Sequence, residues 1–268
     1  MFIFSLILAF FVGIILGLVG SGGSVLTMPI LVYLLGFQTV LATSYSLFIV
    51  GTASLIGAIS YLRSSQVDVK MALLFGVPSI IGVYITRALI LPVLPEVLFT
   101  LGKHEIKLDL FIMLLFAALM LLASISMIRS GSEFDSIGGE KRTRMKYMLV
   151  LTEGVAVGAI TGLVGAGGGF LIIPFLVLMS GMEMKKAVGT SLLIIAAKSL
   201  IGFMGDVQSD LQLDLIFLLS FTSATSIGIL GGSVLSERIS APHLKSGFGW
   251  FILVFACLIL LKEILGIL

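Results

Sequence analysis

The sequence lacks the charged residues that cover the surface of a water-soluble protein. Only 11% of its 268 residues are charged, compared with roughly 25% in an average soluble domain. The 16 basic and 14 acidic side chains are too few to solvate a chain of 28.5 kDa, and the mean hydropathy is +1.23. This composition excludes a water-soluble fold and indicates a polytopic integral membrane protein.

Cysteine and histidine are also scarce, which excludes several classes of site. Cys257 is the single cysteine, so a disulfide scaffold is excluded. His104 and His243 lie in predicted loops, without an HExxH motif or cysteine partners, so we expect no metal. No GxSxG motif or nucleophile–base pair points to an enzyme. Because the net charge is only +2 and no basic stripe is present, nucleic acid is not an expected partner. We also expect no cofactor.

Long apolar runs dominate the chain. A membrane-spanning helix needs about 20 apolar residues, and the runs are too uniformly apolar for the strands of a membrane barrel. We therefore predict an all-α fold of ten segments, at about 2–19, 24–36, 43–61, 70–91, 110–128, 146–164, 169–180, 187–204, 213–234 and 246–265. The second and seventh segments are too short to cross an average bilayer untilted.

The chain contains an internal repeat with an offset of 145 residues. Between residues 17 and 57, 19 of 41 positions are identical to the residue 145 positions later. Chance matches between apolar segments would be far fewer, so the pattern indicates a duplication. We predict a first transmembrane repeat at 1–128, a linker at 129–145 and a second transmembrane repeat at 146–268.

The distribution of lysine and arginine predicts the topology. If all ten segments change side, one side receives 11 of these residues and the other receives four. The positive-inside rule then makes 129–145 cytoplasmic and puts both termini outside a multi-pass protein of the cell inner membrane. Five segments per half is an odd number, so the halves are inverted, as in many secondary transporters.

Glycine-rich breaks precede both short segments. A helix that begins after such a break presents free N–H groups and a partial positive charge. Non-helical backbone survives at membrane depth only where protein or a watery cavity covers it. We expect the two breaks to meet near the midplane and to bind a small anion through Gly20, Ser21, Gly22, Gly23, Ser24, Gly165, Ala166, Gly167, Gly168 and Gly169. The alternative is a pair of tight turns without ligand contact.

Lys198 is the one clear charge that we expect inside the membrane, and a function is the default hypothesis for such a residue. It could attract the anion or take part in proton coupling. The alternatives are snorkelling to the surface or pairing with Glu153 or Asp206. Glu153 is either a proton carrier or an interfacial residue near the cytoplasm.

Small polar residues open the third and eighth segments. Ser46, Thr190 and Ser191 are candidate substrate contacts, and the alternative is helix capping and backbone hydrogen bonding. Ser54 and Ser199 match across the repeat and are candidates for the same cavity. Four further glycines have GxxxG spacing, which favours close helix packing: Gly13, Gly17, Gly158 and Gly162.

These motifs resemble the sulfite exporter TauE/SafE family of membrane transporters. The resemblance rests on the paired motifs at 17–23 and 162–169, on Pro29 and Pro174, and on the Ala-x-x-x-Ser-Leu pattern at 42–47 and 187–192. It implies transport of sulfur-containing anions such as sulfite, sulfonates or related organosulfur acids, coupled to protons. The chain departs from the expected pattern at Ser24 and Lys198.

We therefore predict a secondary transporter that works by alternating access, in which one repeat rocks against the other around a bound anion. Its expected partners are a small anion, a coupling proton and membrane lipid, and a homodimer is left open. The alternatives are a passive anion channel, which needs a continuous polar pore, and a non-transporting membrane scaffold.

Overall fold

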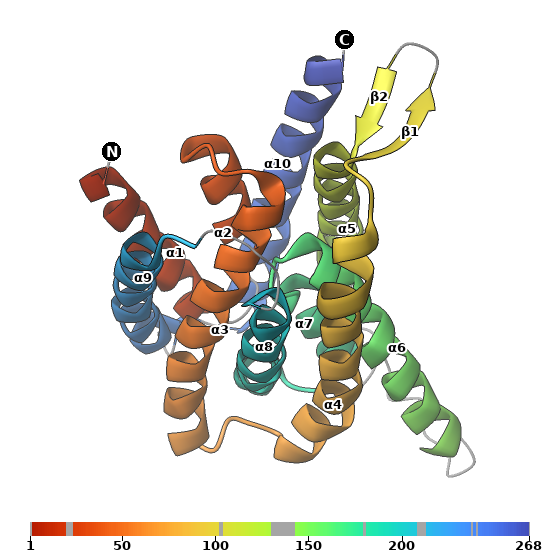
Figure 1. Cartoon of the computed structure of the whole chain (residues 1–268). Helices are drawn as coiled ribbons and strands as arrows, with labels where there is room; N and C mark the ends of the chain where they lie inside the picture. Colours follow the sequence, from red (N-terminus) through yellow and green to blue (C-terminus); the bar gives the residue numbers. More distant parts are fainter. Residues whose placement is uncertain are drawn as a thin grey trace.

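The structure is a computed structural model that describes residues 2–19, 24–101, 104–129, 143–178, 181–207, 213–236, 238–239 and 241–267. The described residues are almost entirely helical (Figure 1). The α-helices are α1 (Phe2–Val19), α2 (Thr27–Pro29), α3 (Thr39–Arg63), α4 (Val69–Ile85), α5 (Leu108–Arg129), α6 (Thr143–Val164), α7 (Gly169–Leu178), α8 (Met184–Val207), α9 (Leu215–Ser236) and α10 (Ala241–Ile267). The predicted all-α fold is confirmed.

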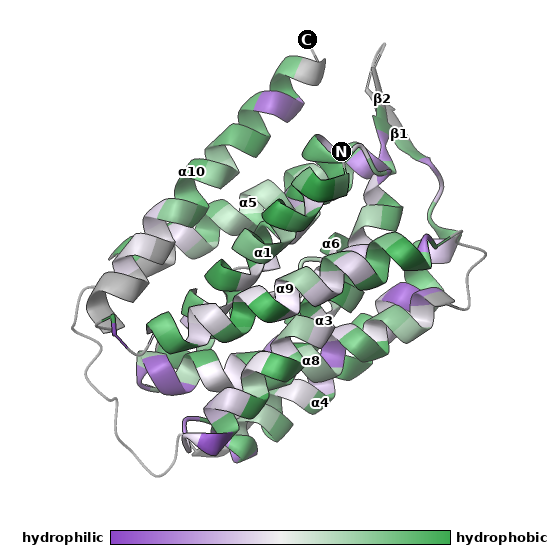
Figure 2. Ribbon diagram, turned by 90° about the vertical axis from the view of Figure 1, so that its left-hand side faces the viewer, coloured by the Kyte–Doolittle hydropathy of each residue, from purple (hydrophilic) through white to green (hydrophobic). Residues whose placement is uncertain are grey.

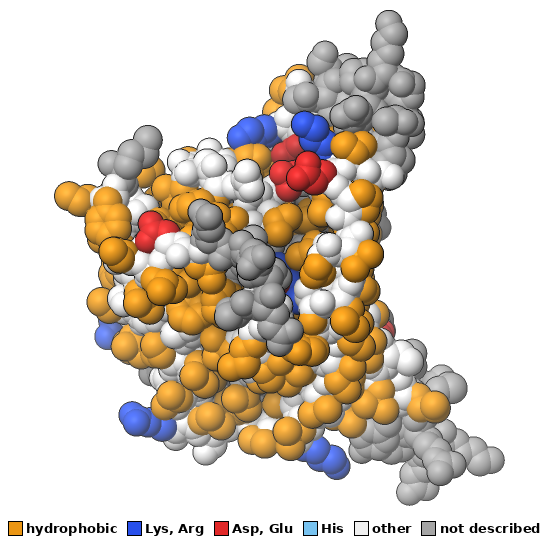
Figure 3. Space-filling view, viewed as in Figure 1, with side chains coloured by type: hydrophobic (Ala, Val, Ile, Leu, Met, Phe, Trp, Pro, Cys, Tyr) orange, Lys and Arg blue, Asp and Glu red, His pale blue; other side chains and the backbone are white. Residues whose placement is uncertain are grey.

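The helices carry the apolar exterior of a membrane protein. Within the described ranges, five helical segments are long and apolar enough to span a membrane: Thr39–Arg63, Val69–Val93, Leu108–Ile125, Met184–Asp206 and Leu215–Ser236. Figure 2 shows that hydrophobic residues predominate along the helices. Hydrophobic side chains also cover most of the face in Figure 3, where most charges lie towards the upper and lower ends. The fold therefore offers a broad apolar surface to lipid.

Short irregular elements complete the first half of the chain. A π-helix, η2 (Ile30–Leu34), follows α2, so the first short segment is less regular than α7. Another π-helical turn, η3 (Thr86–Ile90), and a 3-10 turn, η4 (Leu91–Val93), extend α4. Beyond them lies an antiparallel hairpin of β1 (Val97–Leu101) and β2 (His104–Lys107).

The hairpin differs from the loop that the sequence predicts for 92–109. Pro92 and Pro95 both precede the paired strands, so neither proline interrupts the hydrogen-bonded ladder. The residues that follow, Val97 to Leu101, are mostly β-branched, aromatic or aliphatic, which suits a strand. The prolines mark where the helical segment ends, and they do not exclude a strand beyond it.

Glycines bring helices from different halves of the chain into contact. A Cβ atom added at Gly13 would lie 2.9 Å from the Cα of Gly228, and one at Gly17 would lie 2.7 Å from the carbonyl carbon of Gly232. The numbers of the contacting residues increase together along the two helices, so α1 and α9 run parallel. The same holds for α6 and α4, because Gly158 meets Ser79 and Gly162 meets Thr86. The prediction that these GxxxG glycines serve close packing is confirmed.

Helices α3 and α8 cross at the centre of the bundle. They run antiparallel, since Gly51 lies against Leu200 and Gly57 against Leu192. Figure 1 shows α1 and α6 running in opposite directions, with the N- and C-termini towards the end of the bundle opposite the start of α6. In each half, the first helix packs on the fourth helix of the other half. An inverted repeat produces this pattern, although the repeat itself stays a prediction.

Two hydroxyl groups make equivalent bonds across the halves. The backbone N–H of Asp68 donates to Thr190 Oγ1 over 2.8 Å, and that of Asp214 donates to the Tyr45 hydroxyl over 2.6 Å. Tyr45 and Thr190 are related by the 145-residue offset. The two aspartates also accept from the N–H groups of Met71 and Phe217, so they cap α4 and α9. The Thr190 hydroxyl is thus engaged by backbone, as the capping alternative expects.

Candidate functional site

The second glycine break is a tight reversal between α6 and α7. The N–H of Gly165 still donates to the carbonyl of Thr161 over 2.9 Å, which closes α6. Gly167 and Gly168 then adopt φ angles of +64° and +72°, a region that other residues rarely enter. The carbonyl of Gly168 accepts the first helical bonds of α7, from Leu171 and Ile172 at 3.1 Å each. The reversal leaves the N–H groups at the start of α7 without partners inside that helix.

The described end of the first break meets the second break. A Cβ atom added at Gly167 would lie 3.4 Å from the Cβ of Ser24 and 2.8 Å from the Val50 side chain. One added at Gly165 would overlap Thr43 at the start of α3. Ala166, Gly169 and Ser24 are buried. The calls at Gly20, Ser21, Gly22 and Gly23 lie outside the described residues.

Lys198 joins this cluster from α8. Its side chain is only 1% exposed, and Nζ donates to Thr161 Oγ1 over 2.8 Å. Nζ also lies 2.7 Å from the position of a Cβ atom at Gly168. Neither the snorkelling nor the carboxylate pairing that the sequence left open is observed. The ammonium group instead lies in the interior, beside the glycine that precedes α7.

Buried hydroxyl groups line the helices on either side of Gly167. Ser46 and Ser54 lie four residues before and after Val50 on α3, and Ser199 lies four residues after Ile195 on α8. All three hydroxyls are buried and have no hydrogen-bond partner, a costly state for polar groups inside a protein. Ser191, by contrast, donates to the Val188 carbonyl over 2.8 Å. These three hydroxyl groups therefore have unused hydrogen-bonding capacity on the helices that Gly167 contacts.

A second set of charges lies inside the bundle, which corrects the expectation that Lys198 is the one clear internal charge. Arg87 in η3 is fully buried and Asp206 near the end of α8 is 2% exposed. Arg87 Nη1 and Asp206 Oδ2 form an ion pair at 3.1 Å. The sequence placed these residues at the ends of segments 70–91 and 187–204, where charges usually face solvent. Because η3 and the last turn of α8 continue the helices, both side chains are instead enclosed.

Glu153 lies apart from both sets of charges. It is on α6, partly buried, and its Oε2 atom has no hydrogen-bond partner. Neither Lys198 nor Asp206 pairs with it. Its suggested roles as a proton carrier or an interfacial residue stay predictions.

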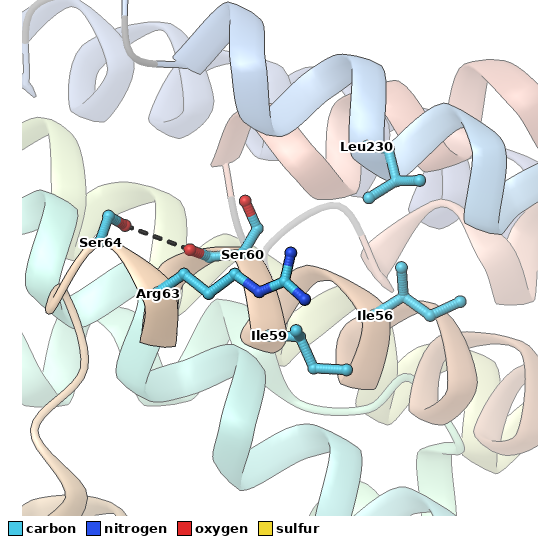
Figure 4. Close-up of a pocket in the computed structure, with 6 residues that line it drawn as sticks. All are labelled: Ile56, Ile59, Ser60, Arg63, Ser64 and Leu230. Atoms are coloured by element: carbon cyan, nitrogen blue, oxygen red, sulfur yellow. Dashed lines mark hydrogen bonds between the residues drawn. The ribbon is translucent and has the colours of Figure 1, made fainter.

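A separate groove opens between α3 and α9 (Figure 4). Its volume is about 410 Å³, and it is lined by Ile56, Ile59, Ser60, Arg63, Ser64 and Leu230. Ile59 and Leu230 are exposed and apolar, so this groove belongs to the outer surface of the bundle. None of the predicted anion-binding residues lines it.

Comparisons with known proteins agree over nearly the whole chain. The family model described as "Sulfite exporter TauE/SafE" matches residues 5–259. A "Probable membrane transporter protein" from Xylella fastidiosa is 28% identical over 94% of this chain and 92% of its own length. The "Probable membrane transporter protein YunE" of Bacillus subtilis is 28% identical, over 78% of this chain and 79% of its own length. No solved structure matches.

Proposed function

Because the chain belongs to the sulfite exporter TauE/SafE family, a family of membrane transporters, we propose that it is a secondary transporter of small sulfur-containing anions. The substrates would be sulfite, sulfonates or related organosulfur acids. The proposal includes proton coupling and alternating access around one central site. It also keeps the predicted arrangement of two inverted repeats, 1–128 and 146–268, with 129–145 in the cytoplasm and both termini outside.

The position of the Lys198 ammonium group carries this proposal. It lies beside Gly168, at the break before α7, and its hydrogen-bond partner Thr161 is neutral. A charged lysine and a helix N-terminus both favour an anion in the space that they share. The Ser46 hydroxyl and Ser24 lie on the opposite, first-half side of the cluster. An oxyanion bound there would accept hydrogen bonds from both halves of the chain.

The same lysine suggests how a proton is coupled. No carboxylate pairs with Lys198 among the described residues, so a bound anion is the natural partner of its positive charge. When the anion leaves, a buried unpaired ammonium is unfavourable, and loss of a proton relieves that cost. Substrate and proton would then leave the site together, which is the linkage that a proton-coupled transporter requires.

Uptake into proteoliposomes tests this function. We expect the wild-type protein to take up radiolabelled sulfite or methanesulfonate, with saturation and with counterflow against unlabelled anion. Lys198→Met should lower uptake at fixed concentration by about tenfold or more, since a hydrogen bond to a charged group contributes about 1.5–3 kcal/mol. Lys70→Met, at an exposed position on α4, is the matched control and should transport normally.

Three outcomes would contradict the proposal. Uptake without counterflow would indicate a channel, and a folded wild-type protein that moves none of these anions would indicate a scaffold. A folded Lys198→Met protein with normal kinetics would remove Lys198 from the site. Folding of each variant is checked by gel filtration and thermal unfolding in detergent.

A further inference from the structure

The Arg87 guanidinium has donors that the protein does not use. Arginine carries five N–H donors, and Arg87 is fully buried. Its Nη1 atom bonds Asp206, but Nε and Nη2 have no hydrogen-bond partner. Unsatisfied buried donors are rare in native structures, and each requires an explanation.

The two free nitrogens lie on the same edge of the guanidinium group. In this planar group, the Nε–H and one Nη2–H point in the same direction and form a fork. Such a fork matches two oxygens of one carboxylate, sulfonate or similar oxyanion, which it binds through two parallel hydrogen bonds. Asp206 occupies only the Nη1 end. The ion pair therefore fixes the orientation of the group and leaves its bidentate edge free.

The Arg87–Asp206 ion pair lies near the glycine break. Arg87 follows Thr86, whose Cβ would be 3.0 Å from a Cβ atom added at Gly162, three residues before Gly165. On the other side, the Arg87 Cβ would be 3.2 Å from a Cβ atom at Gly205 on α8. The Ser44 hydroxyl of α3 also contacts the Asp206 carboxylate. Ser44 follows Thr43, which lies against Gly165. The ion pair is therefore close to the proposed central site.

We propose that the free guanidinium edge of Arg87 is a further contact for the transported oxyanion, with Asp206 as the residue that positions it. This inference rests on the proposed function and adds a binding residue to it. The anion would bind through Nε and Nη2 while Nη1 keeps its bond to Asp206. Asp206 balances the charge of Arg87 when no anion is bound, which limits the cost of an arginine inside the membrane.

A purely structural role explains less of what is observed. An ion pair that only joins η3 to α8 needs a single contact, which a lysine would also provide. It would leave two buried donors unsatisfied, which lowers stability and does not improve packing. The choice of arginine and the two unused donors on one edge both point to an anion that offers two oxygens side by side.

Conservative variants separate the two roles. Arg87→Lys keeps the positive charge and the partner for Asp206 but removes the fork. We expect it to weaken the Kd for sulfite and methanesulfonate by at least about tenfold, from loss of a charge-assisted bidentate contact. Binding is measured by ligand-induced thermal stabilisation in detergent. Arg63→Lys, in the exposed groove between α3 and α9, is the matched control and should bind as the wild type does.

Asp206→Asn supplies an independent readout. It leaves Arg87 with an unbalanced buried charge, so the ligand-free protein should unfold at a lower temperature. If an anion binds the free edge, it replaces that missing charge. Methanesulfonate should then raise the unfolding temperature more in Asp206→Asn than in the wild type. Equal stabilisation of the two proteins, or unchanged binding by Arg87→Lys, would overturn the inference.

A spectroscopic test remains if Arg87→Lys does not fold. Six arginines occur in the sequence, and changing the other five to lysine leaves the ¹⁵Nε–H resonance of Arg87 alone in the spectrum. Methanesulfonate should shift that resonance, and an unmoved resonance at saturating ligand would contradict a site at Arg87. Failure of the proposed function is distinct, because then the wild-type protein itself would show no binding and no uptake.

Discussion

The two halves of the chain differ in the polar side chains that they bury at matching positions. The Lys198–Thr161 pair of the second half corresponds, at the 145-residue offset, to Ala53 and Leu16 in the first, and both of these are fully buried. A lysine and its hydroxyl partner are thus present together in one half and absent together from the other. The two predicted repeats therefore differ in buried charge at this position.

A second difference lies at the ends of the central helices. Asp206 corresponds to Tyr61, whose hydroxyl contacts Ser236 Oγ at 2.9 Å and donates to the Gly17 carbonyl over 3.4 Å. One end of the α3–α8 crossing therefore closes with a charged pair, Arg87–Asp206, and the other with neutral hydroxyls. The two ends therefore differ in charge, and the charged end is the one at which we propose an anion contact.

The largest expected effect comes from making the second half like the first. The double variant Thr161→Leu/Lys198→Ala should abolish anion transport, because it removes the only ammonium group at the break within the described residues. Its stability should stay within about 1 kcal/mol of the wild type or exceed it, since replacing buried polar pairs by apolar residues is often neutral or stabilising. Counterflow and thermal unfolding measure the two effects. Retained transport would show that the difference between the halves has no role in binding.

A smaller effect is expected from Gly167→Ala, because its Cβ atom would lie 2.8 Å from the Val50 side chain. The clash and the positive φ should together cost about 1–3 kcal/mol of unfolding free energy and reduce uptake severalfold. Gly181 has the same φ of +64° but nothing within 4 Å, so Gly181→Ala reports the backbone strain alone. Equal losses in the two variants would mean that the close contact between Gly167 and Val50 is unimportant.

The smallest effect is expected at the neutral end of the crossing. Tyr61→Phe removes one hydroxyl from the contact with Ser236 and should lower the unfolding free energy by about 0.5–1.5 kcal/mol. Substrate affinity should remain within about twofold, which corresponds to a change in binding free energy of at most about 0.4 kcal/mol. A large loss of affinity would place an anion contact at this end as well and would remove the contrast between the two ends.

Local patterns predicted the scaffold more fully than the site. Apolar runs located the helices, and the GxxxG spacing identified Gly13 and Gly17 as packing residues, because both signals depend on a short stretch of chain. The Arg87–Asp206 pair escaped prediction because charges at the end of a helix face either solvent or a neighbour, and the neighbour is known only after folding. The bond from Asp68 to Thr190 also depends on how distant segments come together.

The parallel contacts of α1 with α9 and of α6 with α4 limit how the transporter can move. Backbone touches backbone at Gly13 and Gly17, without side chains that could reorient between them. Sliding the first 128 residues past the rest would break these seams. A motion that keeps these seams intact would carry α1 together with α9, and α6 together with α4.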